Sequence, residues 1–245
     1  MKSVVEVYGK HWFATAHAPQ DSLFVHEFEH QGQKIHIGAL ADGCTDDIHD
    51  RDYQPKLGAT WLVSEFAKQA EAAYAQELRE ESLGRAIVLA ILKGMRDYEP
   101  RYSRSKWKKG PYGAYCDELV ATLYGFVADA DRMVVITCGD GYLIHDGDIA
   151  MVEQSLVYPT DMIASFSEED WPDKLDRVFM IISIDMSQIS AFGIASDGLG
   201  DLGEENVKKV LEQKGTDARG CVNALFHLPI KPLHDDITVV YAVFR

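Results

Sequence analysis

The spacing of hydrophobic residues divides the chain into alternating blocks of strands and helices. Short segments rich in Val, Ile, Phe and His are separated by polar or glycine-containing breaks, which is typical of β-strands. This pattern predicts strands over residues 3–9, 11–18, 22–28 and 34–41. Apolar residues then recur at helical spacing, which predicts two packed helices over residues 56–78 and 83–98.

The second half of the chain repeats this order. Alternating segments over residues 118–129, 132–140, 142–148 and 150–154 predict an antiparallel meander with its clearest turn at HDGD. The pattern weakens over residues 155–177, where prolines and acids surround Trp171, and we expect a surface excursion or flap there. Strands are predicted over 178–184, 189–196 and 236–244, with helices over 204–213 and 216–226.

This order of elements predicts the fold class. It lacks the regular strand and helix alternation of a doubly wound parallel sheet. It favours an α+β fold, a four-layer α-β-β-α sandwich in which two mostly antiparallel sheets pack face to face and helix pairs cover the outside. The sequence has no proline- or serine-rich linker and no internal repeat, so we expect a single domain over residues 1–245.

The composition is that of an ordinary globular protein, with 47% hydrophobic and 26% charged residues. The opening MKSVVEVYGKHWF does not resemble a signal peptide, and no segment approaches about 18 uninterrupted apolar residues. We therefore expect a cytoplasmic protein without a membrane partner. The four cysteines are far apart with no CxxC pair, which argues against a zinc knuckle or a disulfide framework.

The formal net charge of −15 disfavours nucleic acid and anionic membranes as partners, because their phosphates would be repelled. The basic segment RYSRSKWKK, residues 101–109, is a local exception. We interpret it as a solvated loop. The alternative is a contact with nucleic acid or a phosphopeptide through Tyr102 and Trp107.

Five aspartates lie at the borders of predicted strands, and few other acids do. Several strand-end carboxylates that converge at one rim would form a rigid cage of oxygen ligands. Mg²⁺ and Mn²⁺ prefer such ligands. A single Asp-Gly is a common turn dipeptide, so the inference depends on the whole set: Asp21, Asp42, Asp140, Asp197 and Asp235.

Two of these aspartates are followed by glycine. After Asp42 and Asp197, a glycine permits positive φ, a sharp turn and close approach of a backbone carbonyl to a cation. Gly43 is the candidate for that carbonyl.

The succession PQDS, ALADGCTD, CGDGYLIHDGD, GIASDGLGDL and HDDITVVYAV resembles the PP2C (PPM) family of metal-dependent serine/threonine protein phosphatases in its bacterial form. The resemblance runs from about residue 12 to the end of the chain, and ASDGLGD and DDITVV are its more specific parts. It implies an α-β-β-α sandwich, in agreement with the layers predicted above.

The resemblance also implies roles for individual residues. Asp42 would bridge two metal ions, and the Gly43 carbonyl would bind one of them. Asp197 and Asp235 would complete the other site. Asp21 would bind or orient a metal-bound water in the first site.

The implied cofactor is a binuclear Mn²⁺ or Mg²⁺ centre, and Asp140 together with Asp197 would hold a weaker third ion. The implied reaction is hydrolysis of phosphoserine or phosphothreonine in a protein substrate. A water bridging the two metals would attack phosphorus in line, with no covalent enzyme intermediate.

The chain also departs from the family pattern. The arginine that usually grips the substrate phosphate is replaced by Ala16 and His17, so His17 is a candidate phosphate contact. Gln20 stands where eukaryotic members have glutamate, Cys44 begins a replacement of Met-Gly-Gly, and GDG replaces GDS. The proton donor to the leaving group stays open, with His17, His49 and His234 as equivalent choices.

Two other functions compete with catalysis. The missing arginine favours an inactive PP2C-like module that binds a phosphoprotein or another partner. A Ca²⁺ module built on DGCTDDIHDRD is weaker, because its acids do not follow the EF-hand register. The oligomeric state stays open.

Overall fold

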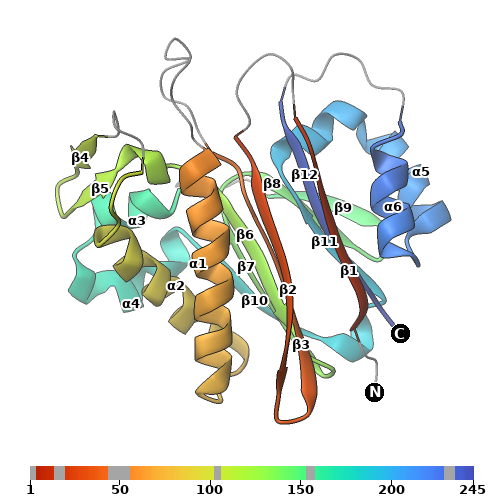
Figure 1. Cartoon of the computed structure of the whole chain (residues 1–245), viewed down its shortest axis with the longest axis horizontal. Helices are drawn as coiled ribbons and strands as arrows, with labels where there is room; N and C mark the ends of the chain where they lie inside the picture. Colours follow the sequence, from red (N-terminus) through yellow and green to blue (C-terminus); the bar gives the residue numbers. More distant parts are fainter. Residues whose placement is uncertain (1–3, 14–19, 44–55, 102–105, 153–157, 229–234) are drawn as a thin grey trace.

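Two five-stranded antiparallel sheets pack face to face, and helices cover both outer faces, in a computed structural model of the chain (Figure 1). The structure describes residues 4–13, 20–43, 56–101, 106–152, 158–228 and 235–245. The α+β four-layer sandwich predicted from the sequence is confirmed. No helix within these ranges is both long and apolar enough to cross a membrane.

The first sheet has the order β1-β12-β11-β8-β9. Its strands are β1 (Val4–Trp12), β12 (Ile237–Phe244), β11 (Ala191–Ala195), β8 (Gly141–His145) and β9 (Asp148–Val152). Two helices cover its outer face, α5 (Glu204–Lys214) and α6 (Ala218–Leu225). The β8–β9 turn is the predicted HDGD hairpin, with both Asp146 and Gly147 at positive φ.

The second sheet has the order β10-β7-β6-β3-β2. Its strands are β10 (Met180–Asp185), β7 (Arg132–Cys138), β6 (Leu123–Ala128), β3 (Gln33–Ala41) and β2 (Ser22–His30). The long helices α1 (Lys56–Ala75) and α2 (Glu80–Arg96) lie on its outer face. Their predicted positions are confirmed within a few residues.

Three apolar clusters fill the spaces between the four layers. One lies between the second sheet and α1 and α2, and a second lies between the first sheet and α5 and α6. The third joins the inner faces of the two sheets, where Phe126 and Phe192 meet edge to face at a centroid distance of 5.9 Å. Because this central cluster contains side chains from both sheets, it fixes the position of one sheet against the other.

The predicted single meander over residues 118–154 is wrong. β6 and β7 belong to the second sheet, whereas β8 and β9 belong to the first. The chain changes sheets at Gly139 and Asp140, and Gly139 has φ of +109°. Hydrophobic alternation does not distinguish pairing within a sheet from a crossing between sheets, which explains the error.

The segment predicted as a flap is helical where the structure describes it. It contains α3 (Pro159–Ser165), α4 (Trp171–Lys174) and short 3₁₀ turns at Glu168–Asp170 and Leu175–Arg177. Trp171 is buried in the cluster beneath α1 and α2 and donates from Nε1 to the Phe166 carbonyl at 3.2 Å. Burial of this one large side chain overrides the weak local pattern.

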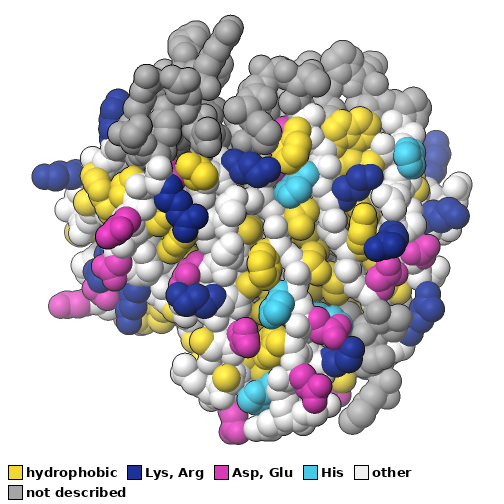
Figure 2. All heavy atoms as spheres, in the orientation of Figure 1, with side chains coloured by type: hydrophobic (Ala, Val, Ile, Leu, Met, Phe, Trp, Pro, Cys, Tyr) yellow, Lys and Arg dark blue, Asp and Glu magenta, His cyan; other side chains and the backbone are white. Residues whose placement is uncertain are grey.

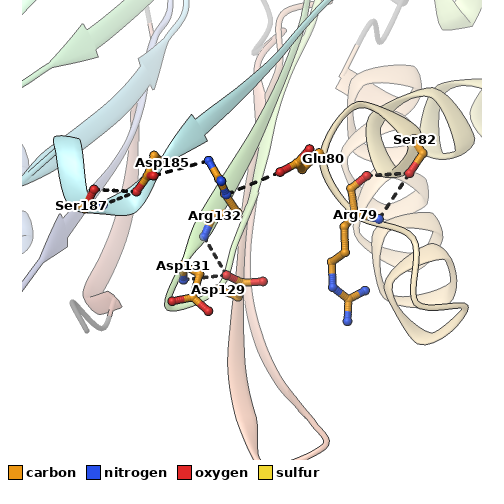
Figure 3. A network of polar contacts seen from close by, with 8 residues as sticks. All are labelled: Arg79, Glu80, Ser82, Asp129, Asp131, Arg132, Asp185 and Ser187. Atoms are coloured by element: carbon orange, nitrogen blue, oxygen red, sulfur yellow. Dashed lines mark hydrogen bonds and ion pairs between the residues drawn. The ribbon is translucent and has the colours of Figure 1, made fainter.

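A polar network lies at the turn between β6 and β7, at the opposite end of the second sheet from Asp42 (Figure 3). The Arg132 guanidinium is 3.5 Å from a carboxylate oxygen of Glu80 and 3.5 Å from one of Asp185. Asp129 Oδ1 accepts from the Arg132 amide at 2.8 Å. The side chains of Arg132 and its two ionic partners are 37–55% exposed, so this network orients the turn more than it stabilises the fold.

Glycine at one core position allows α1 to approach the second sheet. A Cβ at Gly125 would lie 2.3 Å from the Phe66 ring, and Phe66 is fully buried. We predict that Gly125→Ala lowers the free energy of unfolding by about 1–3 kcal/mol, because the Phe66 ring must shift. Urea denaturation measures the change. Ser183→Ala, at an exposed position of β10, is the control and should change stability by less than about 0.5 kcal/mol; an equally small effect of Gly125→Ala would contradict this account.

Candidate metal centre

The ends of strands from both sheets bring three carboxylates together. One oxygen each of Asp42, Asp197 and Asp235 lies within 4.8 Å of the others. Asp42 directly follows β3, Asp197 comes two residues after β11, and Asp235 comes two residues before β12. The three acids span nearly two hundred positions of sequence, and the packing of the two sheets brings them to one rim.

Strand register explains the positions of the other two predicted acids. Ser22 pairs with Ala41, so Asp21 and Asp42 follow as neighbours at the same end of β2 and β3. Ala195 pairs with Tyr142, and continuing this register sets Asp140 opposite Asp197. Asp140 lies outside the group of three within the described ranges, yet its charge contributes to the raised pKa of Asp197.

Asp21 is a carboxylate held inside the protein. It is 0% exposed, and neither of its oxygens has a hydrogen-bond partner among the described residues. Burial raises the pKa of Asp21 to about 7. The side chains of Asp42, Thr238 and Ser196 lie close enough to lower that pKa partly, although none forms a hydrogen bond of ordinary geometry with it.

The pKa values of Asp42 and Asp197 are raised for two reasons. Burial is the largest cause at both residues, and the charges of neighbouring carboxylates are the next. Asp197 Oδ1 is also buried without a partner in the part of the chain that the structure describes. Buried acceptors without donors are unfavourable unless a cation or water satisfies them. A hard divalent cation fits this donor set, since carboxylate oxygens are its preferred ligands.

The two residues before β6, Ala121 and Thr122, fix the backbone around Asp42. The Asp42 carbonyl accepts from the Thr122 amide at 2.8 Å, and the Asp42 amide donates to Thr122 Oγ1 at 3.1 Å. Gly43, the predicted carbonyl ligand, forms an isolated antiparallel bridge with Ala121. These contacts hold the end of β3 against residues 121–122.

Sequence reasoning missed two hydrogen bonds between Ser196 and Thr238, which lie next to Asp197 and Asp235 and which we call the clasp. The Ser196 amide donates to the Thr238 carbonyl at 3.0 Å, and the Thr238 amide donates to Ser196 Oγ at 2.9 Å. Asp236 is fully buried, and its Oδ2 accepts from the Gln20 amide at 2.8 Å. The contacts set the spacing of the strand ends that carry the site. The doubled aspartate in HDDITVV was the available signal, because two adjacent acids at a strand start point to opposite sides.

Glycine is required at position 198 for a different reason from the one predicted. It does not adopt positive φ; instead, a Cβ there would lie 2.1 Å from the Asp236 carbonyl oxygen. The glycine therefore permits the close approach of the Asp197 turn to the start of β12.

One histidine near the site was also missed. His11 Nδ1 lies 2.9 Å from Thr238 Oγ1. The pKa of His11 is lowered to about 4, chiefly by burial and also by the charge of Lys56, while the charge of Asp236 opposes them. His11 is therefore neutral near pH 7 and unsuited to donate a proton to a leaving group.

Several predicted contacts lie outside the described residues. These are the phosphate contact His17, the open proton donors His49 and His234, and most of the Ca²⁺ alternative that begins at Asp42.

The repulsion at this rim predicts a stability change. The raised pKa of Asp42 means that its folded-state contribution is present at low pH and lost as pH rises through its folded pKa. In EDTA at pH 7.5, we expect Asp42→Asn to raise the melting temperature by at least about 3 °C, corresponding to about 1 kcal/mol. The gain should shrink at pH 5, where protonation already relieves the repulsion.

Differential scanning calorimetry at both pH values checks this expectation. Mn²⁺ should raise the melting temperature of the wild type and have a smaller effect on the variant. Asp173→Asn, which removes an exposed acid of α4, is the control. An Asp42→Asn variant that melts below the wild type in EDTA at pH 7.5 would exclude repulsion as the dominant effect.

Comparison with solved structures finds the same fold in phosphatases. A bacterial serine phosphatase carrying a point substitution matches with a TM-score of 0.63 and 13% identity, over 99% of this chain and 100% of that one. The catalytic domain of the serine/threonine phosphatase PstP, in complex with two manganese ions, matches with a TM-score of 0.59 and 16% identity, over 100% and 99%. RsbX in complex with magnesium matches with a TM-score of 0.57 and 14% identity over the whole of both chains.

A sequence comparison with curated proteins found no match. The family model described as protein phosphatase 2C, in contrast, matches residues 9–219. That span contains Asp21, Asp42, Asp140 and Asp197 and most of both sheets. The family resemblance in the sequence is thereby confirmed, and the chain belongs to the protein phosphatase 2C family of protein phosphatases.

Proposed function

We propose that this chain hydrolyses phosphoserine and phosphothreonine in phosphoproteins with the help of two Mn²⁺ or Mg²⁺ ions. The observation that carries the proposal is the group formed by Asp42, Asp197 and Asp235 beside the buried Asp21. Manganese in the PstP domain and magnesium in RsbX support the choice of cation.

Each acid has a separate role in this proposal. Asp42, which comes from the second sheet, would hold both cations, and Asp197 and Asp235 from the first sheet would complete one site. The Gly43 carbonyl and Asp21 would serve the other site, where Asp21 would orient water. Asp140 would join Asp197 in holding a weaker third ion.

The bound cations supply positive charge to the phosphate oxygens and make water more acidic. The chain itself fixes the ligands, because the clasp of Ser196 with Thr238 and the contacts of Thr122 with Asp42 hold the strand ends before substrate arrives. Such preorganisation reduces the cost of bringing the charged groups together during the reaction.

Hydrolysis without a covalent intermediate on the protein agrees with the burial of the described cysteines, which makes them poor nucleophiles. Cys116, Cys138 and Cys221 are all buried. Burial raises the pKa of the Cys138 thiol well above its usual value and that of Cys221 to about 12. Thiols in this state are poor nucleophiles at neutral pH.

The complete carboxylate set also bears on the alternative of a non-catalytic binding module. A surface that only binds phosphate has no need for acids that repel it. The repulsion among buried aspartates is a cost to folding that cations remove, so its presence favours a working metal centre.

Activity measurements test the proposal. We expect the wild type to hydrolyse p-nitrophenyl phosphate and a phosphothreonine peptide in Mn²⁺ and to lose this activity in EDTA. Asp197→Asn should reduce kcat/KM at least about 100-fold, because a lost ligand carboxylate removes several kcal/mol of charge stabilisation. Asp173→Asn is the matched control and should retain wild-type rates.

Two results would count against catalysis of this kind. Turnover that EDTA does not affect would exclude the metal mechanism. Phosphopeptide binding by calorimetry without turnover in saturating Mn²⁺ would instead support the binding module.

A further inference from the structure

A basic and aromatic hairpin lies outside the machinery described above. Residues 101–112 contain five Lys and Arg residues and no Asp or Glu, in a chain whose net charge is −15. The hairpin is the antiparallel strand pair β4 (Trp107–Lys109) and β5 (Ala114–Cys116), and β4 lies within this basic stretch. Arg101, Lys106 and Lys109 are exposed, and Figure 2 shows dark blue side chains at the upper left edge, where Figure 1 places β4.

The hairpin also exposes aromatic surface. Trp107 is 46% exposed and Tyr112 is 63% exposed. Within the described ranges only four large hydrophobic residues are exposed, and these are two of them. Aromatic residues beside Lys or Arg, away from other apolar surface, are typical of contact sites for another molecule.

The base of the hairpin is rigidly held. Buried Glu118 accepts from the Tyr98 hydroxyl at 2.7 Å and from the Arg101 amide at 3.0 Å. Asp117 Oδ1 accepts from the Lys106 amide at 2.8 Å, and the Asp117 amide donates to the Lys106 carbonyl at 3.0 Å. Main-chain contacts of this kind present the basic side chains without the ordering cost of a free loop.

The hairpin is tied to the metal centre through a short stretch of chain. Cys116 ends β5, and Ala121, five residues later, bridges Gly43 beside Asp42. Five residues span at most about 17 Å. A Cβ at Gly58 of α1 would meet the Glu118 carbonyl, so the intervening turn packs closely against the helix. An extended peptide of about six residues covers a span of that length, from the Cys116 end of the hairpin to the residues beside Asp42.

We propose that the β4–β5 hairpin docks an acidic segment of the phosphoprotein substrate next to the phosphorylated residue. Exposed Lys106 and Lys109 complement its carboxylates, and Trp107 packs on its side chains or backbone. This inference rests on the proposed function. Acidic peptides are otherwise repelled by a protein of net charge −15, so a local basic surface gives them one preferred approach.

The test compares the double variant Lys106→Gln/Lys109→Gln with the wild type on three substrates. These are a phosphothreonine peptide flanked by Asp and Glu, the same peptide with Asn and Gln in their place, and p-nitrophenyl phosphate. We expect KM for the acidic peptide to rise about fivefold, with its kcat and the other two substrates unchanged. Trp107→Ala should raise KM for both peptides and leave p-nitrophenyl phosphate unaffected.

The matched control is Lys209→Gln/Lys214→Gln, which removes two exposed lysines of α5 on the other side of the molecule (Figure 1). It changes net charge equally and should leave all rates as in the wild type. Circular dichroism and melting temperatures show whether each variant is folded.

A binding measurement separates failure of docking from failure of the proposed function. Fluorescence anisotropy with the unphosphorylated acidic peptide in EDTA measures peptide binding to the hairpin without a contribution from bound metal ions. A dissociation constant about fivefold weaker in the double variant than in the lysine control supports docking even if no substrate is hydrolysed.

Two outcomes would overturn the inference. One is equal binding and equal KM for the acidic peptide in the double variant and the wild type. The other is loss of binding to a single-stranded oligonucleotide with unchanged peptide kinetics, which would make the hairpin a nucleic-acid contact.

Discussion

The candidate metal centre requires carboxylates that repel one another to lie together where the two sheets meet, and the rest of the fold must hold them there. Asp21 is fully buried, and the pKa values of Asp42 and Asp197 are raised by burial and by the charges of neighbouring carboxylates. Isolated acids in these positions would be a defect of the fold, because buried acceptors without donors cost free energy. A divalent cation turns the same arrangement into an attractive one, so stability and function place opposite demands on these residues.

The remaining architecture resists that repulsion. The central apolar cluster fixes one sheet on the other, and the pairing of Ser196 with Thr238 holds the start of β12 against the end of β11. Gly198 permits the close approach of these two segments. In the second sheet, hydrogen bonds between Thr122 and Asp42 hold the end of β3 in place. The acids therefore belong to strand ends that main-chain hydrogen bonds position independently of any ligand.

The excess of negative charge also affects substrates. The phosphate of a phosphoprotein has the same sign of charge as this chain, and acids line the candidate centre that would receive it. The β4–β5 hairpin, which carries exposed bases, ends at Cys116, five residues before Ala121, and Ala121 bridges Gly43 next to Asp42. In the proposed docking, this basic surface would attract acidic flanks of a substrate, and cations held by the acidic centre would attract its phosphate.

The sequence by itself determined the layers, the helix pairs and the identity of the acids at strand borders, because hydrophobic period and turn residues are local properties. It did not reveal that the chain changes sheets at Asp140, that Trp171 is buried, or that Ser196, Asp236 and His11 support the site. Those facts arise from pairing between segments far apart in the chain. Only tertiary structure decided that Asp42, Asp197 and Asp235 lie within 4.8 Å of one another, since local pattern carries no information on how two sheets are placed face to face.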